Sequence, residues 1–348
     1  MTKIIKVQEE FLDDQLLQEA GEILKKGGLV AFPTETVYGL GGDALNPDSS
    51  RKIYAAKGRP SDNPLIVHIC KWEDIFAIAG EVSEAAEKKA RAFWPGPLTM
   101  ILTKSKLVPY ETTGGLDTVA VRLPSHKVAQ KVIEYAGGYV AAPSANLSGK
   151  PSPTKAKYVV EDMDGRIDMI IDGGEVGIGL ESTIIDLTVS PPQILRPGFI
   201  TEQMLAEVLG EVETDVTILR ADSGQAPKAP GMKYRHYAPK GELIIVTGEA
   251  EKVVEYINVE SAKALQKGEK PGVIATKEEL EKYGTGVVKS VGSRKEERSI
   301  GKRLYTILRE FDDEDVTVIY SEAFDTQGFG QAIMNRLLKA AGHKVIRL

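Results

Sequence analysis

The sequence contains almost no cysteine. Cys70 is the single one among 348 residues, so the chain can form neither an internal disulfide nor a zinc site that requires several cysteines. It stands at the end of an apolar run that begins at Leu65, and this position favours a packing role. Redox chemistry by a pair of thiols is therefore excluded.

Long apolar runs and an excess of positive charge are also missing. No run approaches the ~20 apolar residues that a membrane-spanning helix needs, and residues 1–10 show no signal-peptide core. We therefore expect a cytoplasmic protein that does not contact a membrane. The formal net charge is −6, which argues against a protein that coats nucleic acid with a broad basic surface.

The common nucleotide-binding signatures are absent or incomplete. No GxxxxGK[ST] loop occurs in the sequence, so any ATP site must lack a Walker motif. Residues 39–44 read GLGGDA after an expected strand and match the GxGxxA pattern of a dinucleotide turn. The acidic residue expected about 20 positions later is replaced by a basic stretch that starts at Lys57. We therefore reject a Rossmann cofactor site at residues 39–44.

Length and periodicity indicate two α/β domains. A chain of 348 residues exceeds one ordinary core, and we divide it into a domain at 1–213, a linker at 214–240 and a domain at 241–348. The first domain mixes strands and helices with turn-rich connections, and the pattern does not give its sheet order. The second alternates strands with helices regularly, which is typical of a smaller Rossmann-like parallel sheet. Its expected strands are 242–247, 272–276, 286–291, 315–320 and 344–348, and its expected helices are 249–267, 277–283, 295–311 and 328–341.

The most informative motif is the stretch KGRPSDNP at residues 57–64. It places Lys57 and Arg59 two positions apart, and Gly58 and two prolines keep the backbone out of regular structure. A point charge and a planar fork together suit phosphate or carboxylate. We expect an exposed loop that holds an anion, and the structural alternative is a solvated basic turn.

Four further segments set small hydroxyl or amide side chains at strand ends beside Gly or Pro. Strand ends are where α/β proteins place ligands, and Ser, Thr and Asn offer donors and acceptors to a polar small molecule. Turn or capping chemistry explains each segment alone, but together with residues 57–64 they indicate a polar binding site. The segments are 32–40, 94–99, 142–152 and 181–183.

Cations gather in two segments of this acidic chain. Residues 141–160 hold three and residues 225–240 hold four, and neither segment contains an acidic residue. Such gathering indicates a confined anionic ligand, although a short RNA contact leaves a similar trace. The second segment includes YRHY at 234–237, whose aromatics and cations can stack on a base and bind phosphates. We expect this patch to close over a bound nucleotide as a lid, and the alternative is an ordered linker that packs its tyrosines.

Taken together, these motifs resemble the two-domain type of threonylcarbamoyl-AMP synthase over the whole chain. The segments that carry the resemblance are PTETVYGLG, KGRPSDNP, WPGPLT, RLP, APSANLSGKPSPT, ESTI, RPG and PGMKYRHYAP. The resemblance implies a YrdC-like catalytic domain with a twisted mixed sheet and helices, then a linker and the C-terminal domain. It also implies that L-threonine, bicarbonate and ATP are joined into threonylcarbamoyl-adenylate with release of pyrophosphate. This reaction is the first step of threonylcarbamoyladenosine formation on tRNA.

The resemblance further assigns roles to the residues that match the family's motifs. The catalytic positions that it implies are Lys57, Arg59, Ser144 and Asn146. Those around L-threonine are Thr36, His68, Arg122, Ala142 and Ser182. Those that would hold ATP are Arg59, Asn63, Thr118, Ser144, Ser152, Arg196 and Tyr234. From the residues alone, His68 is as well explained as a core histidine on a strand, and His126 and His343 are expected to be structural.

Cofactors and partners follow from the same resemblance. We expect no metal bound by protein side chains, and Mg²⁺ is expected with the phosphates of ATP. The expected partners are the machinery that transfers the threonylcarbamoyl group to tRNA, and a weak direct tRNA contact. The alternative function is a double-stranded RNA-binding or tRNA-binding module without catalysis. A third function, a carbamoyltransferase of hydrogenase maturation, is disfavoured because such proteins carry cysteine-rich zinc segments.

Overall fold

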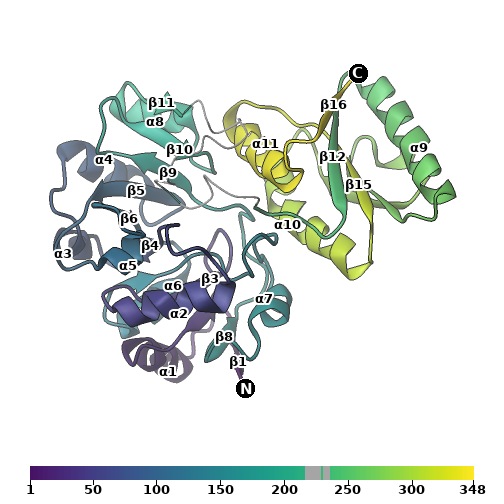
Figure 1. Ribbon diagram of the computed structural model, residues 1–348. Coiled ribbons are helices and arrows are strands. Elements are labelled where there is room, and N and C mark those ends of the chain that lie inside the picture. The colour runs from purple at the N-terminus through teal and green to yellow at the C-terminus, as the bar shows by residue number, and fades with distance from the viewer. Residues whose placement is uncertain (216–228, 230–235) are drawn as a thin grey trace. The chain divides into compact units, whose positions relative to one another are not determined.

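The computed structural model describes residues 1–215, 229 and 236–348, and the chain divides into two compact units (Figure 1). The first unit comprises Met1–Ser148 and Ser152–Tyr234, and the second comprises Arg235–Leu348 together with Gly149–Pro151. The domain boundaries at 213 and 241 stay predictions, because most of the linker between them lies outside the described residues. None of the described helices is long and apolar enough to cross a membrane.

A large mixed sheet forms the centre of the first unit. Its parallel pairs include β1·β8, β4·β6 and β5·β9, and its antiparallel pairs include β2·β3 and β5·β6. The α/β fold with a mixed sheet is thus confirmed. In spatial order the strands are β1 (Lys3–Lys6), β8 (Met169–Asp172), β2 (Val30–Phe32), β3 (Gly39–Asp43), β7 (Val140–Ala141), β4 (Ile66–His68), β6 (Thr118–Arg122), β5 (Leu98–Thr103), β9 (Thr183–Asp186), β10 (Gln193–Arg196) and β11 (Glu213–Thr214).

The helices of the first unit begin and end where local sequence signals place them. The helix α1 begins after Asp13, whose side chain accepts a hydrogen bond from the Leu16 amide. Pro47 starts α2 at its first turn, and Gly58 ends it with a left-handed φ of 61°. The helices are α1 (Asp14–Lys25), α2 (Pro47–Lys57), α3 (Ile75–Ile78), α4 (Glu84–Phe93), α5 (Tyr110–Thr113), α6 (Lys127–Tyr135), α7 (Ala156–Met163) and α8 (Glu202–Leu209), with a 3-10 turn η1 (Trp72–Asp74).

Alternating side chains of the strands separate two hydrophobic clusters. On β8, Met169 and Ile171 belong to a cluster that also contains Leu17 of α1 and Val132 of α6, whereas Ile170 belongs to the other cluster. This alternation is the period of two expected for a strand that is covered on both faces. The central strands are therefore shielded from solvent along most of their length, and polar residues on them require a hydrogen-bond partner.

The glycine-rich stretch that resembles a dinucleotide turn is a buried strand. Residues 39–43 form β3, which pairs antiparallel with β2. A Cβ atom on Gly41 would lie 2.7 Å from the ring of Phe32 and 2.9 Å from the side chain of Val140. The glycine therefore serves close packing rather than a cofactor pyrophosphate, and the rejection of a Rossmann site here is consistent with the structure.

A smaller sheet forms the second unit, and all its strand pairs are parallel. This confirms the predicted Rossmann-like parallel α/β fold (Figure 1, green to yellow). Its strands in spatial order are β14 (Val287–Gly292), β13 (Pro271–Thr276), β15 (Val318–Glu322), β12 (Glu242–Thr247) and β16 (Val345–Arg347). Its helices are α9 (Ala250–Gln266), α10 (Glu297–Asp313) and α11 (Gly328–Ala340), with a 3-10 turn η3 (Leu280–Lys282).

Most predicted elements of the second unit are shifted by one or two residues at an end, and two differ more than the others. The strand expected at 315–320 is β15 at Val318–Glu322, because Asp315 has a positive φ of 52° and the Val316 amide donates back to the Phe311 carbonyl at the end of α10. The helix expected at 277–283 is reduced to η3, since the stretch ends at Gly284 after too few residues for stable helical turns.

Candidate active site

Strand pairing lines up polar residues from separate motifs at the centre of the first sheet. In the parallel pair β4·β6, His68 is the register partner of Arg122. In the antiparallel pair β5·β6, Arg122 is the register partner of Thr99. The hydroxyl of Thr99 lies 2.7 Å from that of Ser182, the residue just before β9. Residues far apart in the sequence are thus brought into one polar row.

Ser182 and Arg196 extend this row toward β10. Arg196 Nη2 donates to Ser182 Oγ at 3.1 Å, and its Nε donates to the Ser182 carbonyl at 3.0 Å. Both residues are buried. Ser182 was predicted to contact L-threonine and Arg196 to hold ATP, so their direct contact places the two predicted subsites next to each other.

The guanidinium of Arg122 is a buried cation, and two of its nitrogen atoms make no hydrogen bond to the described residues. Only 4% of the residue is exposed, and Nη1 donates to Thr36 Oγ1 at 2.9 Å. Nη2 lies 2.7 Å from Glu35 Oε1 without the direction of a hydrogen bond, and Nε has no partner among the described residues. An unsatisfied buried donor is costly, and a carboxylate satisfies two guanidinium donors at once. The site is therefore suited to a ligand carboxylate.

Thr36 is fixed by its own motif. The Thr34 hydroxyl lies 2.8 Å from the Thr36 hydroxyl, and it also donates to the Val37 carbonyl at 2.6 Å. Both threonines are buried. The tight turn of residues 34–37 therefore holds the Thr36 hydroxyl against Arg122, as expected for a side chain that orients a small ligand.

His68 is neutral in this site. The residue is 3% exposed, and its Nδ1 lies 3.1 Å from the Ile66 carbonyl. Burial, followed by the nearby Arg122 and Arg196 charges, lowers the pKa of the imidazole to about 3. At neutral pH the ring is therefore a neutral hydrogen-bonding group and not a cation.

The prediction that Lys57 lies in an exposed loop was wrong. It is the last residue of α2 and is 2% exposed. Its ammonium donates to the carbonyls of Ser144 and Asn146, the latter at 2.6 Å. Gly58 ends α2 directly after Lys57, so the lysine belongs to the last turn of the helix and not to the loop. Lys57 therefore holds the loop at 144–146 in place.

Three of the residues predicted for ATP, namely Arg59, Asn63 and Thr118, lie at the other end of the same strands. Arg59 donates to the carbonyls of Asn63 and Pro64, at 3.3 and 3.1 Å. The Oδ1 atom of Asn63 is buried and has no hydrogen-bond partner in the described part of the chain. Thr118 is the first residue of β6 and Arg122 is its last, so the two lie at opposite ends of this strand. Four residues of a strand span about 13 Å, a length that suits an extended nucleotide.

The loop after β7 carries the remaining predicted residues. The Ala142 amide donates to the Ile66 carbonyl at 2.9 Å, and Ser144 forms an isolated bridge with Gly39. The Asn146 side chain donates to the Leu147 carbonyl at 2.8 Å. Ser152 is buried and donates to Glu181 at 2.6 Å. The structure therefore brings this loop to β3 and β4, next to the Arg122 row.

The predicted lid is the YRHY patch at 234–237. Tyr234 lies outside the described residues. Tyr237 is buried within the second unit, where its ring stands 5.1 Å from that of Tyr305 and Arg336 lies over it at 5.9 Å. This end of the patch is packed as the alternative reading expected, and it is not available to close over a nucleotide.

Three residues of the site were not singled out from the sequence. Glu35 pairs with Arg122, Thr99 contacts Ser182, and Glu181 accepts from Ser152. Each belongs to a motif segment that we named, but their side chains gain a role only through contacts between strands that are distant in sequence. Glu35 also lines a cavity of about 620 Å³ together with His126, whose pKa burial lowers.

Both units match family models. Residues 22–198 match the model described as "Telomere recombination", and residues 200–342 match the model described as "Threonylcarbamoyl-AMP synthase, C-terminal domain". A threonylcarbamoyl-AMP synthase of Pyrococcus abyssi is 48% identical to this chain over 348 residues, which is 100% of both chains. The chain belongs to the threonylcarbamoyl-AMP synthase family.

Other members of the threonylcarbamoyl-AMP synthase family agree over similar lengths. The enzyme of Bacillus subtilis is 46% identical over 96% of this chain and 95% of its own. The crystal structure of P. abyssi Sua5 complexed with L-threonine has a TM-score of 0.94 and 47% identity, with 100% of both chains covered. The family resemblance predicted from the motifs is thereby confirmed, and so is the fold of both units.

Proposed function

We propose that this chain joins L-threonine, bicarbonate and ATP into threonylcarbamoyl-adenylate and releases pyrophosphate. The single observation that carries the proposal is the buried Arg122, whose Nε and Nη2 make no hydrogen bond to the described residues. The carboxylate of L-threonine would accept from these donors. The Thr36 hydroxyl beside them and the neutral His68 would orient the rest of the amino acid.

The chemistry needs no protein nucleophile. The neutral amine of L-threonine adds to bicarbonate or CO₂, and an N–C bond forms to give a carbamate, with loss of water in the case of bicarbonate. A carbamate oxygen then attacks the α-phosphorus of ATP, and the bond to the bridging oxygen breaks with release of pyrophosphate. Negative charge accumulates on all three substrates, so catalysis would come from positioning and fixed cations.

Arg59 and Lys57 would contribute to catalysis in different ways. Arg59 is half-buried, and the carbonyls of its own loop fix it where the phosphates would extend. Lys57 would act mainly by holding the backbone at Ser144 and Asn146, since its ammonium already donates to both carbonyls. We expect Mg²⁺ to arrive with ATP and to neutralise its phosphates.

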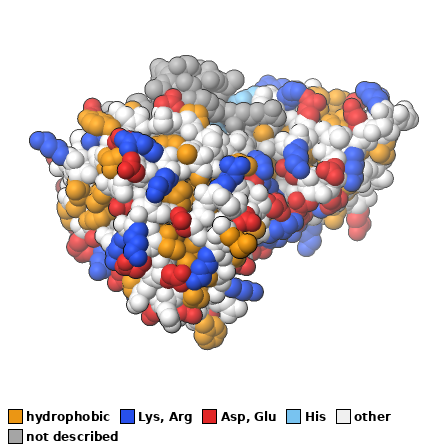
Figure 2. All heavy atoms as spheres, turned by 60° about the horizontal axis from the view of Figure 1, so that its bottom comes forward, with side chains coloured by type: hydrophobic (Ala, Val, Ile, Leu, Met, Phe, Trp, Pro, Cys, Tyr) orange, Lys and Arg blue, Asp and Glu red, His pale blue; other side chains and the backbone are white. Residues whose placement is uncertain are grey.

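The RNA-binding alternative is not favoured. Arg122, Arg196 and Lys57 are 4%, 4% and 2% exposed, so they cannot contact the phosphates of a duplex from a surface. On the face shown in Figure 2, basic and acidic side chains are interspersed and do not form one basic area. A transient contact with tRNA, and delivery of the adenylate to the machinery that modifies tRNA, remain part of the proposed pathway step.

Pyrophosphate release with each substrate omitted in turn tests this function. We expect release only when L-threonine, bicarbonate, ATP and Mg²⁺ are present together. Arg122→Lys keeps the charge but loses the planar fork, and we expect it to raise the KM for L-threonine by about tenfold or more while the KM for ATP changes little. Undiminished release without L-threonine would identify an ATPase and refute the proposal.

A further inference from the structure

The second unit contains a cavity of its own. It has a volume of about 450 Å³, within the range of small-molecule sites. Its walls come from residues 246–254, from residues 322–325, and from Glu279 and Arg294. All of these belong to the second unit, so the cavity is built independently of the site around Arg122.

The cavity lies where this sheet reverses its strand order. β12 and β15 are parallel neighbours. From β12 the chain passes through α9 to β13, on one side of this pair, and from β15 it passes through α11 to β16, on the other side. The two connections leave in opposite directions at the carboxyl ends of the strands, and this separation opens a crevice that α/β proteins use for ligands.

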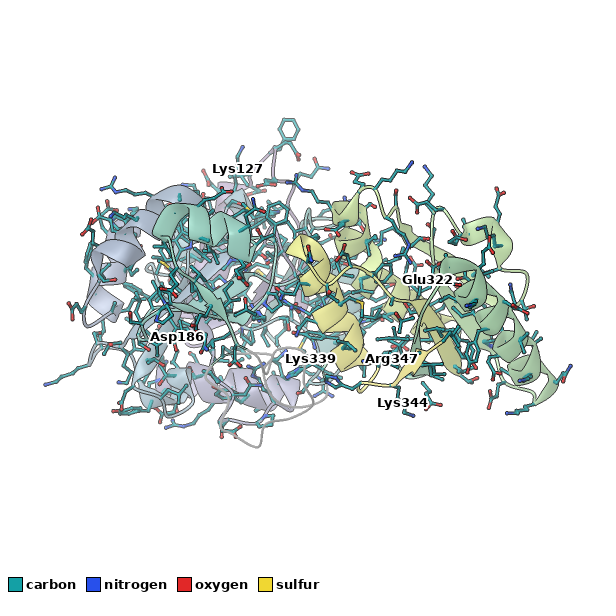
Figure 3. All side chains as sticks on the ribbon, turned by 90° about the horizontal axis from the view of Figure 1, so that it is seen from above. Lys127, Asp186, Glu322, Lys339, Lys344 and Arg347 are labelled. Atoms are coloured by element: carbon teal, nitrogen blue, oxygen red, sulfur yellow. The ribbon has the colours of Figure 1, made fainter. Side chains whose placement is uncertain are left out.

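A buried carboxylate fixes one cation at the cavity. Glu322 ends β15 and is 2% exposed (labelled in Figure 3). It accepts hydrogen bonds from the Thr276 amide and hydroxyl and from the Tyr283 hydroxyl, each at 3.1 Å. Its last donor is Arg294 Nη2 at 2.7 Å. Because all four bonds converge on one carboxylate, Glu322 has no free capacity for a ligand and serves to hold Arg294.

Arg294 presents its remaining donors outward. Nη2 also donates to the Ala323 carbonyl at 3.0 Å, and the guanidinium lies over the Phe324 ring at 5.5 Å. Nη1 and Nε take part in none of these bonds, and 44% of the side chain is exposed. An arginine that is locked at one edge and open at the other is suited to bind a carboxylate. The first turn of α9 borders the cavity at Ala250, and Glu249 makes no side-chain cap there. The amides of this turn can therefore donate to a negative group.

Acidic and apolar groups complete the lining. Asp325 uses Oδ1 to accept from the Gln327 amide at 3.0 Å and leaves Oδ2 for another donor. Glu279 and Glu322 also line the cavity, but Glu279 pairs with Lys282 at 2.6 Å and Glu322 pairs with Arg294 at 2.7 Å. Asp325 is therefore the carboxylate of the lining that faces a ligand with an open oxygen. Val246, Val253 and Phe324 provide buried apolar walls. The cavity thus offers an arginine, a carboxylate with an open oxygen and an apolar wall together.

We propose that this cavity binds an α-amino acid with an apolar side chain. Its carboxylate would pair with the open edge of Arg294 and the N-terminus of α9, and its ammonium with Asp325. A dipolar ligand matches both charges of the lining, whereas a nucleotide or a simple anion would match only one of them. The apolar side chain would cover the valines of α9.

Calorimetric titration of the full chain with L-leucine, L-methionine and L-phenylalanine tests this proposal. We expect at least one of them to bind, and leucinamide and N-acetyl-leucine, which each lack one charge, to bind about tenfold more weakly or worse. Arg294→Gln should weaken binding by a similar factor, and Lys295→Gln, an exposed neighbour outside the cavity, should not. Arg294→Gln leaves the buried charge of Glu322 without its partner and could disturb the fold. The double variant R294Q/E322Q removes both charges and controls for this effect.

The proposal fails if none of the three amino acids binds at millimolar concentration. It also fails if the two derivatives bind as tightly as L-leucine. A further contradicting result is an unchanged affinity for the amino acid in both R294Q and R294Q/E322Q, provided that thermal melting shows both variants to be folded. Binding of adenosine or of inorganic phosphate in place of the amino acids, with dependence on Arg294, would assign the cavity to a different class of ligand and overturn the proposal.

Discussion

Replacement of Lys57 by Met separates a loop-holding role from a purely electrostatic one. The ammonium donates to two backbone carbonyls in the loop at 144–146. Each buried acceptor that loses its donor costs about 1–3 kcal/mol, and the loss is partly offset because the buried charge itself is removed. We therefore expect Lys57→Met to lower the free energy of unfolding by about 2–4 kcal/mol.

The same variant should lose activity through the loop. Ser144 and Asn146 would no longer be held at β3 and β4, so we expect pyrophosphate release to fall roughly 10²-fold or more. Urea unfolding gives the stability and substrate-dependent pyrophosphate release gives the turnover. Lys52→Met on the same helix is the matched control, because Lys52 is exposed and donates to the Gly27 carbonyl at 2.6 Å. We expect Lys52→Met to lower the free energy of unfolding by less than about 1 kcal/mol.

The pair of measurements can refute the reasoning in two ways. If Lys57→Met is as stable as the unaltered chain but inactive, the lysine acts on the substrates and does not hold the loop. If both stability and turnover are unchanged, the contacts from Lys57 to the Ser144 and Asn146 carbonyls contribute nothing to the free energy of unfolding or to catalysis. The expected result is loss of both, with Lys52→Met close to the unaltered chain.

Two further predictions concern the first unit. Arg59→Ala should reduce turnover roughly 10²-fold with little loss of stability, since Arg59 is half-buried and donates to the Asn63 and Pro64 carbonyls of its own loop. Arg51→Ala, an exposed neighbour, is the control, and equal effects of the two variants on steady-state pyrophosphate release would contradict the phosphate role. His68 has a folded-state pKa lowered from 6.5 to about 3, so the unfolded chain binds the proton more readily and stability should fall as pH drops from about 6.5 toward 3. Urea unfolding between pH 6.5 and 5 should show this slope, up to about 1.4 kcal/mol per pH unit, and a His68→Gln variant with the same slope would refute it.

Local sequence patterns were sufficient for the class of fold and for the family. Regular alternation of strands and helices after residue 241 predicted the parallel sheet, and hydroxyl-rich segments at strand ends predicted a polar binding site. The motifs were long and specific enough to carry the family resemblance, which the comparisons confirm. The class of fold and the family depend on patterns among neighbouring residues, so a single sequence is enough to predict them.

Burial and strand pairing decided what the sequence could not. Lys57 looked like an exposed loop cation because its neighbours are Gly and Pro, yet it ends a helix and lies inside the unit. Thr99 and Ser182 meet only because β5 pairs with β9, and Arg294 is held by Glu322 only because β15 ends beside it. Such contacts depend on register between segments tens of residues apart, and no local periodicity encodes that register. The sequence therefore determined which side chains are available for chemistry, and the tertiary structure decided which of them meet.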